Sequence, residues 1–204
     1  SMGAQIIGEG TSTIQIEGVD NLSPIEHTVI PDRIEAATYM AALGMTGGQI
    51  VIEEARLDHM EMLVEKLNEM GMEIDQVDGG VSVCVSKRLR SVDLATLPYP
   101  GVATDYKPFM VALLSISDGV GIVTENIFAG RFRYVDELIR MGADIRAEGH
   151  HAVVRGVERL SGAPVRAPDI RAGAALVLAG LAAEGETFVG TANHIERGYQ
   201  NLVG

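Results

Sequence analysis

A unit of β-rich and helical segments that occurs three times is the feature that most constrains the fold of this chain. Residues 14–23 and 153–161 both consist of a short β-rich run, a Gly-Val pair and a turn that ends in Leu-Ser. Each is followed by a Pro-Asp pair and by an alanine-rich helical stretch, at 34–43 in one copy and 172–181 in the other. Self-similarity of this kind predicts one supersecondary unit repeated along the chain.

A more diverged third copy lies between these two. Alternating valines in 81–85 predict one face of a strand, and Asp105 opens a helical stretch that runs to Ile116. In each copy the helix ends at a glycine that precedes another β-rich run. These glycines are Gly48, Gly119 and Gly185. They predict equivalent turns in the three copies.

A second helix follows in two of the copies, at 58–70 and 134–141, and each ends at a glycine. In the third copy this helix would begin near Glu196, so we expect the third repeat to be truncated. Alternating β and α elements without a Pro- or Ser-rich linker predict one α/β domain over residues 1–204. The approximate repeats are 13–80, 81–150 and 151–204. Three equivalent units further predict pseudo-threefold symmetry.

Charge and composition exclude several classes of function. The net charge of −12 argues against nucleic acid as a partner, because a phosphate-binding face needs a basic excess. Hydrophobic residues make up 47% of the chain and aromatic residues only 4%, which predicts an aliphatic core. We find no signal peptide and no apolar run of membrane-spanning length, so we expect no membrane partner. The single cysteine, Cys84, permits no internal disulfide and fits a cytoplasmic location.

An aspartate lies where the first helix begins in every copy, at Asp32, Asp105 and Asp169. One interpretation is N-capping, because a carboxylate accepts hydrogen bonds from the free N–H groups of the first helical turn. We favour this interpretation for Asp32. The other follows from approximate symmetry, which would point all three helix N-termini toward one end of the domain. Free N–H groups and partial positive charge would then suit that end to an anion.

Arginines near helix starts bear on the second interpretation. Arg131, Arg171 and Arg197 lie near such starts in the second and third copies. Guanidinium groups there could clamp a phosphate and a carboxylate, although spacing alone favours an ordinary surface arginine at each position. No metal site is predicted, because the adjacent histidines at 150–151 have no partner ligands at metal spacing. Cys84 is interpreted as a structural strand residue.

Longer motifs lie at 124–128 (Thr-Glu-Asn-Ile-Phe), at 168–172 and at 194–199 (His-Ile-Glu-Arg-Gly-Tyr). Shorter ones lie at 31–34, 104–105, 131–132, 160–163 and 176–180. Together they cover nearly the whole chain in order. In this combination they resemble the UDP-N-acetylglucosamine 1-carboxyvinyltransferase family of enolpyruvyl transferases.

The resemblance implies a fold and a reaction. Members of this family have two similar domains, each an inside-out, barrel-like α/β assembly of three repeats with helices inside and sheets outside. The implied reaction transfers enolpyruvate from phosphoenolpyruvate to the 3-hydroxyl of UDP-N-acetylglucosamine and releases phosphate, as the first committed step of peptidoglycan synthesis. It implies no cofactor and no metal, and both substrates would be shared with the second domain.

The resemblance also implies roles for individual residues. Asp105 matches the family's general base, which takes the proton of the sugar hydroxyl. The family's positions around phosphoenolpyruvate are matched here by Arg131, Arg171 and Arg197. These arginines would hold phosphoenolpyruvate and stabilise the departing phosphate. Asp169 matches a residue that contacts the reacting groups, and Ile127 matches one whose backbone contacts the sugar nucleotide.

The sequence departs from the family at two places and leaves alternatives open. Ala129-Gly130 stand where members usually have an acidic residue and then Asn or Ala, and Val102-Ala103 stand where they tend to have Phe-Pro. The family's Lys-Asn pair and its reactive-loop Cys or Asp belong to segments outside these residues, so we expect this piece alone to be inactive. One alternative is a domain of a 3-phosphoshikimate 1-carboxyvinyltransferase. Another is a non-catalytic module that binds a sugar nucleotide or a protein.

Overall fold

The computed structural model describes residues 2–200 and 202, and the chain divides into two compact units, Ser1–Ile30 and Pro31–Gly204. The sequence predicted one domain whose first repeat starts at residue 13, whereas the structure places residues 13–30 in the first unit. In that unit β1 (Gln5–Ile7) pairs antiparallel with β2 (Gln15–Glu17). Nearly all of its described residues are exposed, because two short strands alone bury little apolar surface.

The second unit alternates helices with strands in three successive groups. The first group contains α1 (Arg33–Thr46), β3 (Gly48–Glu53), the 3-10 helix η1 (Leu57–His59), α2 (Glu61–Met70), β4 (Glu73–Val77) and β5 (Gly80–Val85). The second contains β6 (Leu94–Ala95), α3 (Lys107–Ile116), β7 (Val120–Thr124), α4 (Val135–Arg140), β8 (Asp144–Glu148) and β9 (His151–Arg155). The third contains β10 (Leu160–Ser161), β11 (Pro164–Arg166), α5 (Ile170–Ala182), β12 (Ala183–Glu184), β13 (Phe188–Gly190) and α6 (Asn193–Glu196).

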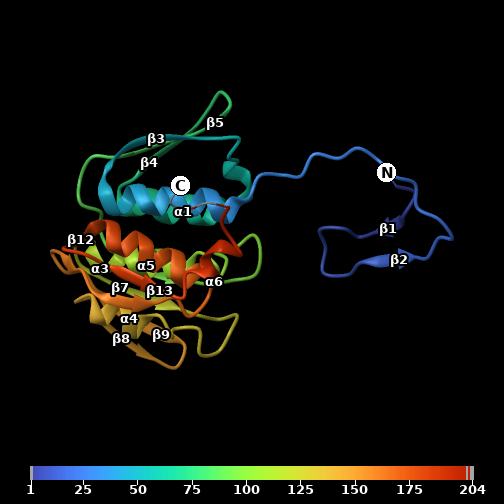
Figure 1. Ribbon diagram of the computed structural model, residues 1–204. Coiled ribbons are helices and arrows are strands. Elements are labelled where there is room, and N and C mark those ends of the chain that lie inside the picture. Colours follow the sequence, from blue (N-terminus) through green and yellow to red (C-terminus); the bar gives the residue numbers. More distant parts are fainter. Residues whose placement is uncertain (1, 201, 203–204) are drawn as a thin grey trace. The chain divides into compact units, whose positions relative to one another are not determined.

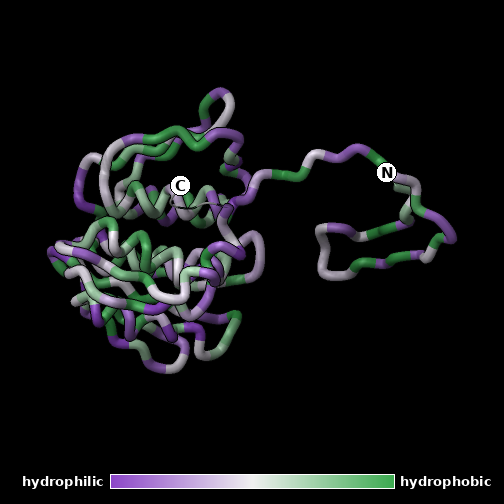
Figure 2. The backbone as a smooth tube through the Cα atoms, viewed as in Figure 1, coloured by the Kyte–Doolittle hydropathy of each residue, from purple (hydrophilic) through white to green (hydrophobic). Residues whose placement is uncertain are grey.

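The helices α1, α3 and α5 form the centre of the second unit. Each contacts the other two, and the strands lie outside them (Figure 1). Residues Lys107 to Ser115 of α3 are all buried, as expected for a helix enclosed on every side. Figure 2 shows hydrophilic residues in many of the turns that join the elements. Most of the buried side chains are Ala, Val, Leu, Ile and Met, so the prediction of an aliphatic core is confirmed.

Two sheets of the second unit share one strand order. The first has the order β3-β5-β4, and the second repeats it as β7-β9-β8 with β6 added parallel to β7. In the third group β10 pairs parallel with β12, and β11 pairs parallel with β13. The predicted α/β class is confirmed. The strands of the described residues form separate sheets and not a closed barrel.

The predicted turn glycines occupy equivalent places. Gly48, Gly119 and Gly185 follow the ends of α1, α3 and α5, with φ angles of 111°, 107° and 92°. These angles lie in the left-handed region, which glycine adopts without the steric penalty of a Cβ atom. The prediction of equivalent turns is therefore confirmed at these three positions.

No helix within residues 2–200 and 202 is long and apolar enough to cross a membrane. The same residues contain no group of three or more His, Cys, Asp or Glu side chains that could hold a metal ion.

Candidate functional site

Two of the three predicted helix-start aspartates act as N-caps. Asp32 precedes α1, and its carboxylate accepts a hydrogen bond of 2.7 Å from the amide of Ile34. Asp169 precedes α5, and its carboxylate accepts one of 2.9 Å from the amide of Ala172. Both contacts satisfy N–H groups that have no partner within the helix. The capping interpretation is confirmed for these two residues.

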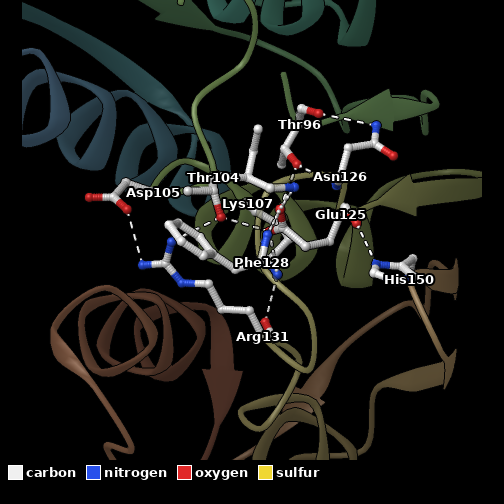
Figure 3. Close-up of polar contacts among 10 residues, drawn as sticks. Thr96, Thr104, Asp105, Lys107, Glu125, Asn126, Phe128, Arg131 and His150 are labelled. Atoms are coloured by element: carbon white, nitrogen blue, oxygen red, sulfur yellow. Dashed lines mark hydrogen bonds and ion pairs between the residues drawn. The ribbon is translucent and has the colours of Figure 1, made fainter. Parts of the chain in front are cut away.

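Asp105 behaves differently, although it also lies next to a helix start. Its Oδ1 accepts a hydrogen bond of 3.0 Å from Nη2 of Arg131, and its Oδ2 accepts one of 3.3 Å from Nε of Arg171. Figure 3 shows the contact with Arg131. The carboxylate is 33% exposed, so it is open to solvent and to a ligand. Three residues predicted from the sequence thus meet at one point, although they lie up to 66 positions apart.

Arg171 also contacts an aromatic ring. Its guanidinium carbon lies 5.3 Å from the centre of the Tyr199 ring, and the Tyr199 hydroxyl is 2.8 Å from Oγ1 of Thr38 on α1. The side chain is only 16% exposed. Its Nη1 is buried and makes no hydrogen bond of good geometry within the described residues. Burial and the Tyr199 ring therefore hold the Arg171 guanidinium in place beside Asp105.

Arg131 lies at the end of a tight segment that begins at Glu125. The Glu125 carboxylate accepts hydrogen bonds from the hydroxyls of Thr96 and Thr104, at 2.7 and 2.6 Å. It also accepts from the amides of Ile127 and Phe128, at 2.8 and 3.2 Å. The segment therefore wraps around one buried carboxylate. The Ile127 amide already has a partner, so any contact of the Ile127 backbone with a ligand would have to use its carbonyl.

A buried cation completes this environment. Nζ of Lys107 lies 2.8 Å from Oε2 of Glu125, and both side chains are fully buried. Burial would raise the pKa of Glu125, but hydrogen bonds from Lys107 and the two threonines outweigh it and hold that pKa at about 2. Burial lowers the pKa of Lys107, and the contact with Glu125 opposes that shift. The hydrogen bonds to Glu125 therefore favour its charged carboxylate form, which faces the Lys107 amine at 2.8 Å.

The remaining predicted residue, Arg197, does not join this cluster. It is exposed at the C-terminal end of α6 and forms no ion pair or hydrogen bond through its side chain with any other described residue. Its predicted contact with phosphoenolpyruvate stays a prediction. Neither Lys107 nor Glu125 was predicted from the sequence as part of the site. A lysine in the first turn of the otherwise apolar helix α3 was the available signal, because a buried lysine needs a partner.

The arrangement can bind an anion beside a proton acceptor. Two guanidinium groups converge on one carboxylate, and each can form two parallel hydrogen bonds with a phosphate or carboxylate. An anion that reached both arginines would compete with Asp105 for their N–H groups. The carboxylate would then be free to accept a proton from a neighbouring hydroxyl.

Comparison with known proteins decides the family. The family model described as EPSP synthase (3-phosphoshikimate 1-carboxyvinyltransferase) matches residues 1–204. The chain belongs to the EPSP synthase family. The solved structure of the enolpyruvyl transferase NikO from Streptomyces tendae is similar, with a TM-score of 0.87 and 30% sequence identity. That match covers 99% of this chain and 49% of NikO.

Two curated relatives carry a more specific name. UDP-N-acetylglucosamine 1-carboxyvinyltransferase 2 of Caldanaerobacter subterraneus subsp. tengcongensis is 52% identical over 203 residues, which is 99% of this chain and 49% of that protein. UDP-N-acetylglucosamine 1-carboxyvinyltransferase of Mycobacterium bovis is 50% identical over 206 residues, with the same two shares. These names confirm the resemblance found in the sequence. The chain spans about half the length of the curated relatives it matches.

Proposed function

We propose that this chain is part of an enolpyruvyl transferase that moves enolpyruvate from phosphoenolpyruvate to the 3-hydroxyl of UDP-N-acetylglucosamine and releases phosphate. We further propose that Pro31–Gly204 is most of one of two similar domains with helices inside and sheets outside. The names of the relatives support the reaction. The observation that carries the proposal is the meeting of Asp105 with Arg131 and Arg171. A cytoplasmic location is part of the proposal and fits the single cysteine.

The chemistry requires a base and a clamp for anions. The sugar hydroxyl must lose its proton as its oxygen bonds to the enol carbon, and a carboxylate within hydrogen-bonding reach can take that proton. We assign this role to Asp105. Phosphoenolpyruvate carries a phosphate and a carboxylate, and we assign Arg131 and Arg171 to hold them. Fixed positive charge there would also stabilise the phosphate as its bond to the enol carbon breaks.

Three further residues are proposed to contact the substrates. Asp169 keeps its capping hydrogen bond, so only its second carboxylate oxygen is proposed to face the reacting groups. Ile127 is proposed to contact the sugar nucleotide through its carbonyl oxygen. Arg197 is proposed to contact phosphoenolpyruvate from α6, whose residue Ile195 packs in the core.

The test is a phosphate-release assay on the full-length protein with two acceptors. Phosphoenolpyruvate together with UDP-N-acetylglucosamine should give phosphate, and phosphoenolpyruvate together with shikimate 3-phosphate should not. Release with shikimate 3-phosphate but not with UDP-N-acetylglucosamine would instead assign the 3-phosphoshikimate 1-carboxyvinyltransferase reaction named in the family description. Release with neither acceptor would favour a non-catalytic binding module. The 204-residue chain alone should be inactive, because the reaction needs water excluded between two walls of a cleft.

A further inference from the structure

The ion pair between Lys107 and Glu125 has no contact with the Asp105 carboxylate, yet it is fully buried. Every other ion pair of the described residues has at least one side chain that is one-quarter exposed or more. Moving two charges out of water has a cost that their attraction often fails to offset. A buried ion pair is therefore weak evidence for a stabilising role. The groups that Lys107 and Glu125 contact indicate a different role.

The Lys107 ammonium connects the two ends of segment 125–132. It contacts the Glu125 carboxylate at 2.8 Å and donates to the backbone carbonyl of Arg131 at 2.6 Å. The Phe132 ring lies over it, with 4.1 Å from Nζ to the ring centre. Lys107 is the first residue of α3, so this one side chain fixes both ends of the segment to that helix (Figure 3).

The Glu125 carboxylate fixes the interior of the same segment. It accepts hydrogen bonds from the amides of Ile127 and Phe128 and from the hydroxyl of Thr104. The Thr104 oxygen in turn accepts a hydrogen bond of 2.9 Å from Nη1 of Arg131. Arg131 is thus held at its backbone by Lys107 and at its guanidinium by Thr104, and both of these are bonded to Glu125.

We propose that Lys107 and Glu125 are positioning residues that set where the Arg131 guanidinium lies relative to Asp105. The inference rests on the proposed function and adds to it the means by which one arginine of the anion clamp is fixed. A hydrophobic pair could fill the same volume but could not donate to the Arg131 carbonyl. It also could not accept from the amides of residues 127 and 128.

If the proposal is correct, a variant can bind phosphoenolpyruvate more weakly without losing stability. In the full-length protein, the double variant Lys107→Met, Glu125→Gln removes both buried charges together, so neither is left unpaired. We expect its melting temperature to stay within a few degrees of the wild-type value. We expect its KM for phosphoenolpyruvate to rise roughly tenfold to a hundredfold, because the arginine is no longer held in place.

A matched control and a second variant complete the experiment. Lys66→Met removes a partly exposed lysine that pairs with Glu69 at 2.7 Å, and it should leave melting temperature and kinetics unchanged. If the double variant does not fold, Thr104→Val tests the same connection without a change of charge. It should raise KM for phosphoenolpyruvate several-fold.

Three outcomes are distinguishable. A raised KM for phosphoenolpyruvate in the folded double variant, with Lys66→Met like wild type, supports the positioning role. A wild-type KM in the folded double variant, or in Thr104→Val where that variant stands in, overturns it. If the wild-type protein shows no turnover, the proposed function fails instead. Calorimetric titration with inorganic phosphate then still tests positioning: the variant should bind phosphate more weakly than wild type, and equal affinity would refute the role.

Discussion

The start of α5 and the start of α3 carry the same residue type and use it for different purposes. Asp169 caps α5, whereas Asp105 binds two arginines. Asp169 is the N-cap of α5, whereas the N-cap of α3 is Tyr106, so Asp105 lies one residue before the cap position. The residue three positions further on also differs. Ala172 offers its amide to Asp169, but the equivalent neighbour of Asp105 is Pro108, which has no N–H. The Lys107 amide, the other candidate, already donates to the carbonyl of Thr104.

In a repeated unit, the aspartate of one copy can lose its role in helix capping and become available for other contacts. At α1 and α5 the aspartate is occupied by the helix itself. At α3 the proline removes a donor, and the carboxylate is left for groups from other parts of the chain. We expect variants of the two kinds of aspartate to differ in the property that they change: activity at α3 and stability at α1.

The largest effect is expected for Asp105→Asn in the full-length protein. Asparagine keeps the size of the side chain but cannot take a proton at neutral pH. Turnover should fall by roughly 10²–10⁴-fold, the range for loss of a general base. Asp32→Asn is the matched control, because asparagine caps a helix about as well as aspartate, so its turnover should stay near wild type. Equal losses in both variants, measured by phosphate release, would remove the distinction between α3 and α1.

A smaller loss is expected for Arg171→Met, which removes one cation of the clamp. The value of kcat/KM for phosphoenolpyruvate should fall by roughly 10²-fold, as for the loss of one charge-stabilising donor. Arg146→Met is the control, since the side chain of Arg146 is 84% exposed on β8. Steady-state kinetics at varied phosphoenolpyruvate concentration measure both. An unchanged kcat/KM in Arg171→Met would show that the meeting with Asp105 is only structural.

A pH effect is expected from Glu125, whose pKa is lowered from its usual value near 4.5 to about 2. A carboxyl with a lowered pKa in the folded protein stabilises it above the unfolded pKa. That contribution is lost as the pH falls toward the folded pKa. The free energy of unfolding should therefore decrease from about pH 4.5 to about pH 2, and Glu125→Gln should show a shallower decrease. Urea unfolding across this range compares the two, and parallel curves would contradict the lowered pKa.

The smallest effect is expected at a cap. Asp32→Ala should lower the free energy of unfolding by about 1 kcal/mol, because the amide of Ile34 loses its partner. Turnover at a temperature well below unfolding should remain near wild type. Chemical denaturation of the full-length protein gives the stability, and a loss of turnover without a loss of stability would assign Asp32 to the site and not to the cap.

The sequence was sufficient for features that depend on local pattern. The first helix of each copy, the second helices of the first two copies, their closing glycines and the α/β class follow from hydrophobic periodicity and from glycine conformation, and the structure has them close to where they were expected. The second helix of the third copy was expected to begin near Glu196, whereas α6 spans Asn193–Glu196 and ends there. The division after Ile30 was not predicted. The similar β-rich runs at 14–23 and 153–161 predicted equivalent positions in two repeats of one domain. Which unit a strand joins depends on its pairing partners and not on its local pattern.

For the site, residue types and the family resemblance together named Asp105, Arg131 and Arg171, which the structure brings together. The support for Arg131 could not be predicted, because Lys107 and Glu125 are 18 positions apart and their contact depends on how β7 packs beside α3. A clue to the free carboxylate of Asp105 and one to the buried pair were nevertheless present in the sequence. Pro108 indicated that Asp105 would not cap, and Lys107 in an apolar helix indicated a buried partner.

The most direct test of the account is the distance between the Asp105 carboxylate and the sugar 3-hydroxyl in a crystal structure of the full-length protein with UDP-N-acetylglucosamine and phosphate. The account predicts about 2.6–3.2 Å, the reach of a general base. It also predicts phosphate oxygens on Arg131 and Arg171 in place of Asp105. A carboxylate still bonded to both arginines and beyond hydrogen-bonding distance of the hydroxyl would contradict the account.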